Sequence, residues 1–424
     1  MFLYFLLPFF FLLLGSCASS KKFVDENKEE EKVIKKEVRF EKETVEKEII
    51  NTASLPVRIL TNDSTINLSF TVDTPLKISA ENKTVAIVNN GNGIKIQNES
   101  GKLSLSINGN IFYSDVFNFS SAEDNTVFFF NGKKYRGSVI VSAGNKIINV
   151  VPLEDYLKGV LPAEMPLGKN DENFEALKAF AICARTYTMM KLNENKPDFD
   201  LYIDVRDQVY GGVEREKDLS NKAIAATTGM ILEYGGKPAG IFYHASCGGY
   251  TEDGGNVFSG GNKPYLSMIK DGDEPYCSIT PRFEWEEKYP LQEFVSRLSK
   301  AGLINSDDFR IESIGINSRF ISGRVNEIEI NLISDSSGSK DIKIYGNQIR
   351  SIIRTGDNKG ILRSTMFNIN ADSDSITITG KGYGHGVGLC QWGAISQSRQ
   401  GIGYLQILRH YFPGTEVSQL KIKN

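Results

Sequence analysis

A single glutamate stands in a stretch of the sequence that is suited to proton transfer. Glu164 is flanked by Leu161 and Pro162 on one side and by Met165 and Pro166 on the other. Apolar surroundings disfavour the carboxylate anion and so raise the pKa of a carboxyl group, while prolines restrict the backbone that carries it. Since a general acid must keep its proton near neutral pH, Glu164 is the candidate catalytic residue. The alternative is a glutamate on a solvated turn before a helix, where its charge favours the helix N-terminus.

Arginine and histidine residues add further candidates for chemistry. Arg185 lies in the middle of an apolar stretch, where a guanidinium either holds an anionic group of a ligand or pairs with a buried acid. His385 lies among alternating glycines at positions 382, 384, 386 and 388, which allow a close approach of the backbone and suit the wall of a cleft. The glycine spacing lacks the pattern of a nucleotide-binding loop. His410 lies among aromatic and aliphatic residues and is expected to be structural.

The cysteines limit the metal and redox chemistry. Cys183, Cys247, Cys277 and Cys390 lie beyond the N-terminal segment. Cys183 stands in an apolar helical stretch and is expected to be a buried free thiol. A zinc site formed by His244, Cys247 and Cys277 would lack an obvious fourth ligand, so we expect no bound metal and no cofactor.

The segments around these residues alternate between helix and strand patterns. Residues 171–195 contain strong helix formers with apolar residues at three- and four-residue steps, which predicts a central, largely buried helix. Short strands with turns follow, with a helix pattern at residues 291–302 and one or two short helices from residue 391 onward. The chain is therefore expected to have an α+β fold, with a strand-rich main domain over residues 130–420.

Residues 55–129 form a β-rich accessory region ahead of the main domain. Apolar and polar residues alternate in this region, and Asn-Gly and Gly-Asn pairs mark hairpin turns. No linker separates the region from the main domain, so at least its last hairpins are expected to join the core of that domain.

The composition of the whole chain excludes several classes of protein. The 424 residues are 40% hydrophobic and 24% charged, which is typical of a folded globular protein and not of a disordered chain or a multi-span membrane protein. The formal net charge of −3 provides no basic excess for a phosphate backbone. Nucleic acid is therefore not an expected partner.

The N-terminus carries an export signal. Residues 1–17 form an apolar stretch that is short for a membrane span and ends in small residues before Cys17. The pattern resembles a bacterial lipoprotein signal, although no lysine or arginine precedes the apolar run. Acylation of Cys17 would anchor the protein to a membrane, facing the cell wall from the periplasm or the outer cell surface. The alternative is an ordinary secretory signal with a chance cysteine. Residues 18–54, rich in lysine and glutamate, are expected to be a charged linker.

Several blocks of the sequence occur in the order found in one protein family. They include "LEDYLKGVLPAEMP", "EALKAFAICARTY", "DQVYGGV", "YHASCGGYTED" and "GKGYGHGVGLCQWGA". Over residues 130–417 the chain resembles the SpoIID/LytB family of stage II sporulation protein D and amidase enhancer. Several independent blocks in sequence are more specific than a lone short motif.

The resemblance implies a peptidoglycan lytic transglycosylase. Family members cleave the bond between N-acetylmuramic acid and N-acetylglucosamine on glycan strands stripped of stem peptides, and they leave 1,6-anhydro ends. The family's catalytic glutamate matches Glu164 in the Ala-Glu-Met-Pro stretch. The alternative is a domain that only grips glycan strands and stimulates a partner cell-wall amidase, as the amidase enhancer name suggests.

The resemblance also implies roles for other residues. Arg185 would bind the substrate or the charge that develops near Glu164. Tyr250 would stack on a sugar ring and donate a hydrogen bond to it, unless it is a half-buried strand tyrosine. His244 and His385 would support the cleft by hydrogen bonds instead of transferring protons.

Two further implications of the resemblance concern the cysteines. Related sequences often carry a second cysteine soon after the "PYL" block, which favours a disulfide between Cys247 and Cys277, and an exported compartment permits it. Some family members bind zinc through cysteine and histidine just ahead of the Gln-Val-Tyr block. The corresponding stretch here, "DFDLYIDVRDQVYGG", contains neither residue type, so that zinc site is absent.

Overall fold

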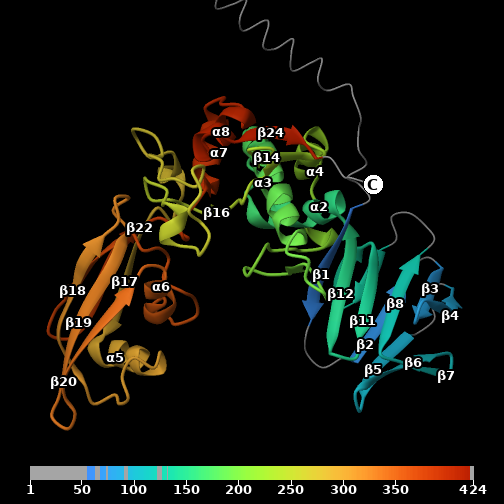
Figure 1. Cartoon of the computed structure of the whole chain (residues 1–424), viewed down its shortest axis with the longest axis horizontal. Helices are drawn as coiled ribbons and strands as arrows, with labels where there is room; N and C mark the ends of the chain where they lie inside the picture. Colours follow the sequence, from blue (N-terminus) through green and yellow to red (C-terminus); the bar gives the residue numbers. More distant parts are fainter. Residues whose placement is uncertain are drawn as a thin grey trace, which may run out of the picture. The chain divides into compact units, whose positions relative to one another are not determined.

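The structure is a computed structural model (Figure 1), and it describes residues 55–62, 67–72, 75–89, 94–121, 127–130 and 132–420. The expected signal at residues 1–17, with Cys17, and the whole of the expected linker at residues 18–54 lie outside this part of the chain. Within the described residues, no helix is both long enough and apolar enough to cross a membrane. The strands and helices together form the α+β fold that the sequence predicts.

Two large sheets contain most of the strands before residue 153. The strands of the seven-stranded sheet are, in spatial order, β13 (Leu201–Tyr202), β1 (Pro56–Asn62), β12 (Lys146–Pro152), β11 (Ser138–Ser142), β8 (Val116–Ser121), β3 (Leu76–Ala80) and β4 (Lys83–Val88). The strands of the six-stranded sheet are β10 (Lys133–Arg136), β9 (Val127–Phe130), β2 (Asn67–Val72), β5 (Ile94–Glu99), β6 (Lys102–Ile107) and β7 (Asn110–Ser114). Neighbouring strands are antiparallel, except that β1 and β13 are parallel.

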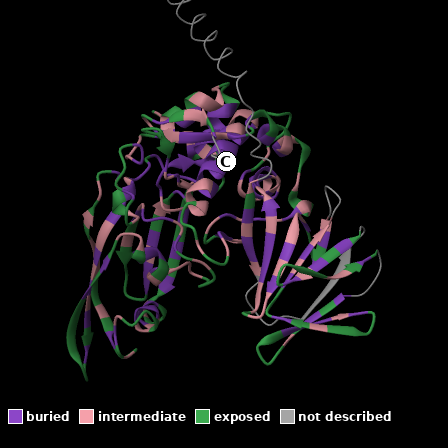
Figure 2. Cartoon of the chain, turned by 45° about the vertical axis from the view of Figure 1, so that its right-hand side comes forward, coloured by how far each residue is buried: buried purple, intermediate pink, exposed green. Residues whose placement is uncertain are grey.

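The residue pattern of the strands explains how they pair and which side they bury. In β3, Leu76, Ile78 and Ala80 are buried, and the residues between them are more exposed. Figure 2 shows buried and more exposed residues following one another along several strands. The hairpin of β6 and β7 turns at Asn108 and Gly109, whose φ angles are 48° and 82°. Both residue types tolerate positive φ, so this turn confirms the hairpin expected from an Asn-Gly pair.

The sheets are continuous across residue 130. Strand β1 comes from the expected β-rich accessory region, yet it pairs with β12 and with β13, which follow that residue. Strand β9 likewise pairs with β10. An ion pair of 2.6 Å between Arg58 and Asp200 joins the segments that carry β1 and β13. Not only the last hairpins but also the first strand of the accessory region therefore share a sheet with the main domain.

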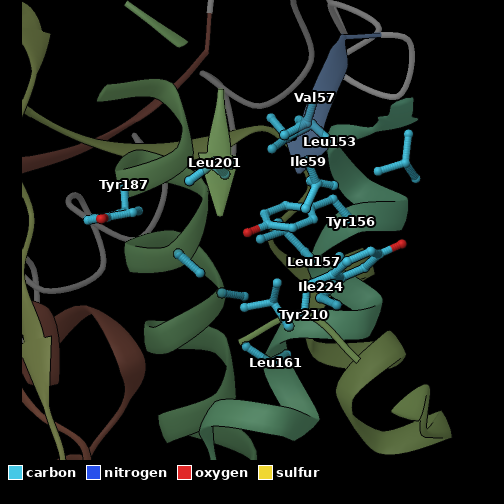
Figure 3. Close-up of a cluster of buried hydrophobic side chains, with 14 of the residues drawn as sticks. Val57, Ile59, Leu153, Tyr156, Leu157, Leu161, Tyr187, Leu201, Tyr210 and Ile224 are labelled. Carbon is cyan, nitrogen blue, oxygen red and sulfur yellow. The ribbon is translucent and has the colours of Figure 1, made fainter. Parts of the chain in front are cut away.

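Several helices share one hydrophobic core with these sheets. They are α2 (Leu153–Glu164), α3 (Phe174–Leu192), α4 (Asp218–Ala226), α7 (Gln391–Arg399) and α8 (Tyr404–Tyr411). Helix α3 is buried along most of its length, which confirms the central helix predicted from the sequence. Figure 3 shows how side chains of α2 lie against those of β1, β13 and α4.

Small sheets and 3-10 helices complete this part of the chain. One sheet contains β15 (Lys237–Pro238), β14 (Met230–Tyr234) and β24 (Glu416–Gln419), and another pairs β16 (Tyr243–His244) with β23 (Leu389–Cys390) in parallel. The 3-10 helices are η2 (Val213–Arg215), η3 (Gly254–Asn256) and η4 (Tyr276–Ile279).

Residues 284–381 have a second hydrophobic core of their own, and we call them the inserted unit. Its two sheets have the strand orders β17 (Glu284–Pro290), β22 (Ser375–Lys381), β21 (Phe367–Ala371) and β18 (Arg310–Arg319), β19 (Val325–Ser334), β20 (Gly338–Tyr345). Its helices are α5 (Leu291–Lys300), which confirms the helix pattern at residues 291–302, and α6 (Gln348–Ile353). The single domain expected over residues 130–420 thus contains two hydrophobic cores, and the second one is not evident from the residue pattern.

Candidate active site

Glu164 is the last residue of helix α2. Pro166 disfavours helical geometry in the residue before it, and Met165 is accordingly extended, with φ −122° and ψ 130°. A solvated turn before a helix is the alternative setting that the sequence allows for Glu164. The glutamate instead ends a helix, where the negative end of the helix dipole disfavours an anion.

Two hydrogen-bond donors reach the Glu164 carboxyl group. The N–H of Val209 donates to Oε1 at 2.7 Å, and the side chain of Gln391 gives a second hydrogen bond. Burial is the largest effect on this group and raises its pKa, while both hydrogen bonds favour the anion and partly oppose the shift. The net result is a carboxyl group with a raised pKa, as its apolar neighbours in the sequence predict.

Three tyrosines interact electrostatically with this carboxyl group. Tyr156 and Tyr187 are buried, and Tyr243 of β16 is half-buried. Burial first, and then nearby carboxylates that include Glu164, raise the pKa of all three. Their hydroxyl groups therefore stay neutral. The rings of Tyr187 and Tyr243 meet edge to face with centroids 6.2 Å apart. The groups that interact electrostatically with this carboxyl group thus include three neutral tyrosine side chains.

Helices α2 and α3 position the segment that presents the Val209 N–H. Tyr187 of α3 donates its hydroxyl hydrogen to Oδ1 of Asp207 at 2.8 Å. Thr188 of α3 lies 3.0 Å from Oε1 of the buried Gln208. Tyr210 then packs on Tyr156 of α2 with ring centroids 5.1 Å apart (Figure 3). Contacts on both sides of Val209 therefore fix where its amide points.

The arrangement suits a single carboxyl group that gives and takes a proton. A carboxyl with a raised pKa at the end of a helix can protonate a leaving group and accept a proton afterwards. In the part of the chain that the structure describes, its hydrogen-bond partners are a backbone N–H and an amide side chain. Neither partner is a second carboxylate of the kind that activates water in ordinary glycoside hydrolysis.

Arg185 is fully buried and pairs with an acid at the other end of α2. Its Nε and Nη2 donate to the two carboxylate oxygens of Glu154 at 2.8 and 2.7 Å, and its Nη1 donates to the Met230 carbonyl at 2.9 Å. Glu154 and Glu164 are separated by almost the whole helix, about 15 Å at about 1.5 Å per residue. The structure thus places Arg185 in the buried ion pair that the sequence analysis gave as the alternative to substrate binding.

The two candidate histidines lie together, and none of the hydrogen bonds among the described residues joins them to Glu164. Their rings, on His244 and His385, have centroids 5.6 Å apart. Nδ1 of His244 lies 3.1 Å from the Val387 carbonyl oxygen, and Nδ1 of His385 accepts the Val387 N–H at 3.0 Å. Burial lowers the pKa of His244 to about 3, and it also lowers the pKa of His385. Neutral rings held by backbone groups are consistent with a supporting role and not with proton transfer.

Tyr250 is 38% exposed and pairs with Lys270 in an isolated β-bridge. An exposed ring is free to stack on a ligand, so the expected substrate role of Tyr250 stays a prediction.

A separate hollow of about 510 Å³ lies on the inserted unit, where Trp285, Arg319 and Lys381 contribute to its lining. Glu164 is not among the residues that line this hollow.

The structure brings Cys247 and Cys277 together without joining them. Their sulfur atoms lie 3.4 Å apart, whereas a disulfide bond has a length of about 2.05 Å, so both are free thiols here. The sulfur of Cys390 lies within 4.8 Å of these two sulfur atoms. Cys183 is a buried free thiol of α3, as expected from the apolar stretch that contains it.

Three residues with contacts in this region are not evident as site residues from the sequence. Val209 and Gln391 contact Glu164, and Glu154 pairs with Arg185. All three lie within the sequence blocks that carry the family resemblance, so membership of these blocks is the sequence feature that could have identified them. Their side chains and backbone groups meet only after distant segments have folded together, which no local spacing reveals.

Two protein-family models match this chain, one ahead of the inserted unit and one over the inserted unit. A family model described as "Stage II sporulation protein" matches residues 142–234, which contain α2, α3 and Val209. A second model, described as "Domain of unknown function (DUF8618)", matches residues 276–388, which contain the inserted unit.

Curated relatives cover most of the chain. An uncharacterised protein of Brachyspira hyodysenteriae is 33% identical over 342 residues, which are 79% of this chain and 82% of that protein. The amidase enhancer of Bacillus subtilis is 31% identical over 62% of this chain and 40% of that protein. A stage II sporulation protein D, from Bacillus amyloliquefaciens, is 29% identical over 66% of this chain and 78% of that protein. The chain belongs to the SpoIID family of stage II sporulation protein D and amidase enhancer.

Proposed function

We propose that the protein acts on the bacterial cell wall as a peptidoglycan lytic transglycosylase, with Glu164 as its single general acid and base. The observation that supports this proposal is the setting of Glu164, whose burial raises its pKa and whose carboxyl group receives hydrogen bonds from Val209 and Gln391. Denuded glycan strands are the proposed substrate, as the family resemblance implies.

The proposed reaction needs no second carboxylate. Glu164 gives its proton to the oxygen that links N-acetylmuramic acid to N-acetylglucosamine, and the bond from that oxygen to the muramyl anomeric carbon breaks. The muramyl 6-hydroxyl oxygen then bonds to the same carbon, and its proton passes to the Glu164 carboxylate. The product carries a 1,6-anhydro end, and Glu164 is again protonated. Attack from within the same sugar avoids the entropy cost of positioning a water molecule.

A second candidate function is a domain that grips glycan strands and stimulates a partner amidase without cleaving them. The observation that favours this alternative is the 31% identity to a protein named amidase enhancer. Both functions require binding to the cell wall, so binding to peptidoglycan does not separate them.

Product analysis separates the two functions. Purified full-length protein is incubated with denuded glycan strands, and the products are identified by mass spectrometry. Anhydromuramyl products that are absent with Glu164→Gln would support the transglycosylase. Unchanged strands, together with a faster reaction of an added cell-wall amidase, would contradict it and support the enhancer.

Gln391 is expected to tune the pH range of the proposed activity. Its side chain donates to the Glu164 carboxyl group and favours the anion, so Gln391→Met should raise the pKa of Glu164 further. Activity that requires protonated Glu164 should then persist to higher pH, which a profile of kcat/KM against pH measures. Gln397→Met is the control, because Gln397 is a buried glutamine of the same helix that donates to Tyr411 instead. A profile that stays in place or moves to lower pH would contradict this role of Gln391.

We further propose that the protein is exported and anchored to a membrane through acylated Cys17. A protein that carries two acyl groups binds a membrane far more stably than a protein that carries one. Loss of the acylated cysteine removes this anchor. Cys17→Ser is therefore expected to move the exported protein from the membrane fraction to the soluble fraction and to stop incorporation of labelled palmitate. Ser19→Ala, which keeps the cysteine, should change neither result. Unchanged membrane association of Cys17→Ser would contradict the anchor.

A further inference from the structure

Four buried side chains with metal-binding atoms meet next to the start of α7. They are Cys247, Asp271, Cys277 and Cys390, and their ligand atoms all lie within 4.8 Å of one another. Cys277 belongs to η4, and Cys390 is the last residue of β23. The other two lie in the segments that follow β16 and precede η4. Segments distant in the sequence thus converge on one point.

The spacing of these atoms fits one tetrahedral ion. Zinc binds thiolate sulfur at about 2.3 Å and carboxylate oxygen at about 2.0–2.2 Å, which in a tetrahedron places two sulfur atoms roughly 3.8 Å apart and a sulfur and an oxygen roughly 3.5–3.7 Å apart. The sulfur atoms of Cys247 and Cys277 lie 3.4 Å apart, within about 0.4 Å of the spacing for two sulfur ligands. A disulfide between these two would take their sulfur atoms away from an ion and leave Cys390 and Asp271 as the two remaining ligands.

Hydrogen bonds around the cluster favour negatively charged ligand atoms. The N–H of Cys247 donates to the sulfur of Cys390 at 3.3 Å. Asp271 accepts the hydroxyl hydrogen of Tyr411 at 2.6 Å on one oxygen and the N–H of Cys277 at 2.9 Å on the other. Partners of this kind orient metal ligands and stabilise their deprotonated forms.

Arg324 adds a buried positive charge beside the cluster. Its side chain is 1% exposed, and Nη2 donates to the backbone carbonyl of Cys247 at 2.7 Å. Glu252 and the sulfur atoms of the cluster attract this charge. Three thiolates and one carboxylate would carry four negative charges. The two positive charges of a divalent ion and the single charge of the guanidinium leave one net negative charge. Charge compensation of this kind is what buried ionised groups require.

We propose that Cys247, Asp271, Cys277 and Cys390 bind one structural zinc ion. All four positions of the tetrahedron are filled by protein ligands, so the centre is closed and stabilises the fold instead of activating water. Cys390 directly precedes Gln391, and the ion would therefore fix the start of α7 and the hydrogen-bond donor to Glu164. The proposal does not depend on the function proposed above.

The ligand set differs from the one that the sequence suggested. The sequence allows a zinc site with His244, Cys247 and Cys277, but it offers no obvious fourth ligand and therefore predicts no bound metal. His244 instead places Nδ1 against the Val387 carbonyl oxygen, and it is not part of the cluster. Asp271 and Cys390 complete the ligand set, and their proximity comes only from the fold.

Metal analysis of the full-length protein tests the site. Protein purified under reducing conditions should contain about one zinc ion per chain, as measured by inductively coupled plasma mass spectrometry. Exchange of zinc for cobalt should produce thiolate-to-cobalt charge-transfer absorption and the visible bands of a tetrahedral ion. Cys390→Ser should weaken zinc binding by more than about 10-fold, which is the lower bound seen when only a supporting partner of a ligand is lost. Cys183→Ser removes a buried thiol of α3 outside the cluster and should keep the full zinc content.

Three results would each overturn the proposal. They are a wild-type protein that binds no zinc after reconstitution, a Cys247–Cys277 disulfide in protein recovered from the exported fraction, and an unchanged zinc affinity of Cys390→Ser. If Cys390→Ser does not fold, the wild-type protein still decides. A chelator should then make the three cluster thiols reactive toward an alkylating reagent, and an unchanged alkylation rate with chelator would count against the site.

Discussion

Glu164→Gln is expected to lower the rate of glycan cleavage by about 10²–10⁴-fold, the usual contribution of general acid and base catalysis. Glutamine has nearly the same shape as glutamic acid, and its side-chain oxygen can still accept the hydrogen bond from the Val209 N–H. It cannot give a proton to the glycosidic oxygen. The effect should therefore fall on kcat, and binding of glycan strands should change little.

The pH dependence of the wild-type rate provides a second test of the same carboxyl group. Burial raises the pKa of Glu164, and the reaction needs its protonated form. The rate should thus fall as the pH rises through this raised pKa, at a higher pH than an ordinary exposed glutamate would allow. A profile of kcat/KM against pH measures this limb.

The same pKa shift predicts the sign of the stability change. The pKa of Glu164 is higher in the folded than in the unfolded chain, so the folded chain binds the proton more tightly. The stability that this group contributes is present at low pH and is lost as the pH rises through the folded pKa. Glu164→Gln should therefore melt at a similar temperature to the wild type in acid and at an equal or higher temperature near neutral pH. Thermal denaturation at the two pH values measures the difference.

Glu312→Gln is the matched control, because Glu312 is exposed on β18 of the inserted unit. It should leave both rate and stability unchanged. If folded Glu164→Gln kept wild-type cleavage, Glu164 would not be the proton donor.

The fold was predictable wherever the residue pattern is local. Alternating strands, the Asn108-Gly109 turn and the apolar helix α3 all follow from short-range periodicity and turn chemistry. Helix α2 was missed, because Pro162 and Pro166 mark its end as a turn although Pro162 lies inside the helix. The second core of the inserted unit was also missed, since the separation of two cores depends on which distant strands pair.

The site was predictable only in its central residue. The apolar neighbours and the prolines around Glu164 are adjacent to it in sequence, so its raised pKa could be expected. Val209 and Gln391 lie far along the chain from Glu164, and only the packing of α2, α3 and α7 brings them to the carboxyl group. The same limit applies to Arg185, whose partner could be named only as an unspecified buried acid.

Glu154→Leu is expected to destabilise the protein by about 3–5 kcal/mol, because it leaves the Arg185 charge buried without a partner. The guanidinium is fully buried, and both of its hydrogen bonds to Glu154 are shorter than 3 Å. The double variant Glu154→Leu with Arg185→Met should regain much of this loss, since replacing both charges of a buried pair with apolar groups removes the unpaired charge. The free energy of unfolding from denaturant titration measures both values.

The control is an exposed pair of the same helix. Asp155 and Lys158 form a partly exposed ion pair, and Asp155→Asn should cost less than about 1 kcal/mol. A similar small cost for Glu154→Leu would mean that the buried pair contributes little to stability.

The double variant also separates the two roles considered for Arg185. If Arg185 serves only the ion pair, the folded double variant should retain its rate of glycan cleavage, because Glu154 and Arg185 meet at the far end of α2 from Glu164. If Arg185 binds substrate, as the family resemblance implies, the folded double variant should lose cleavage or show a raised KM. Since the guanidinium has no exposed surface and both Glu154 oxygens occupy it, we expect the first result.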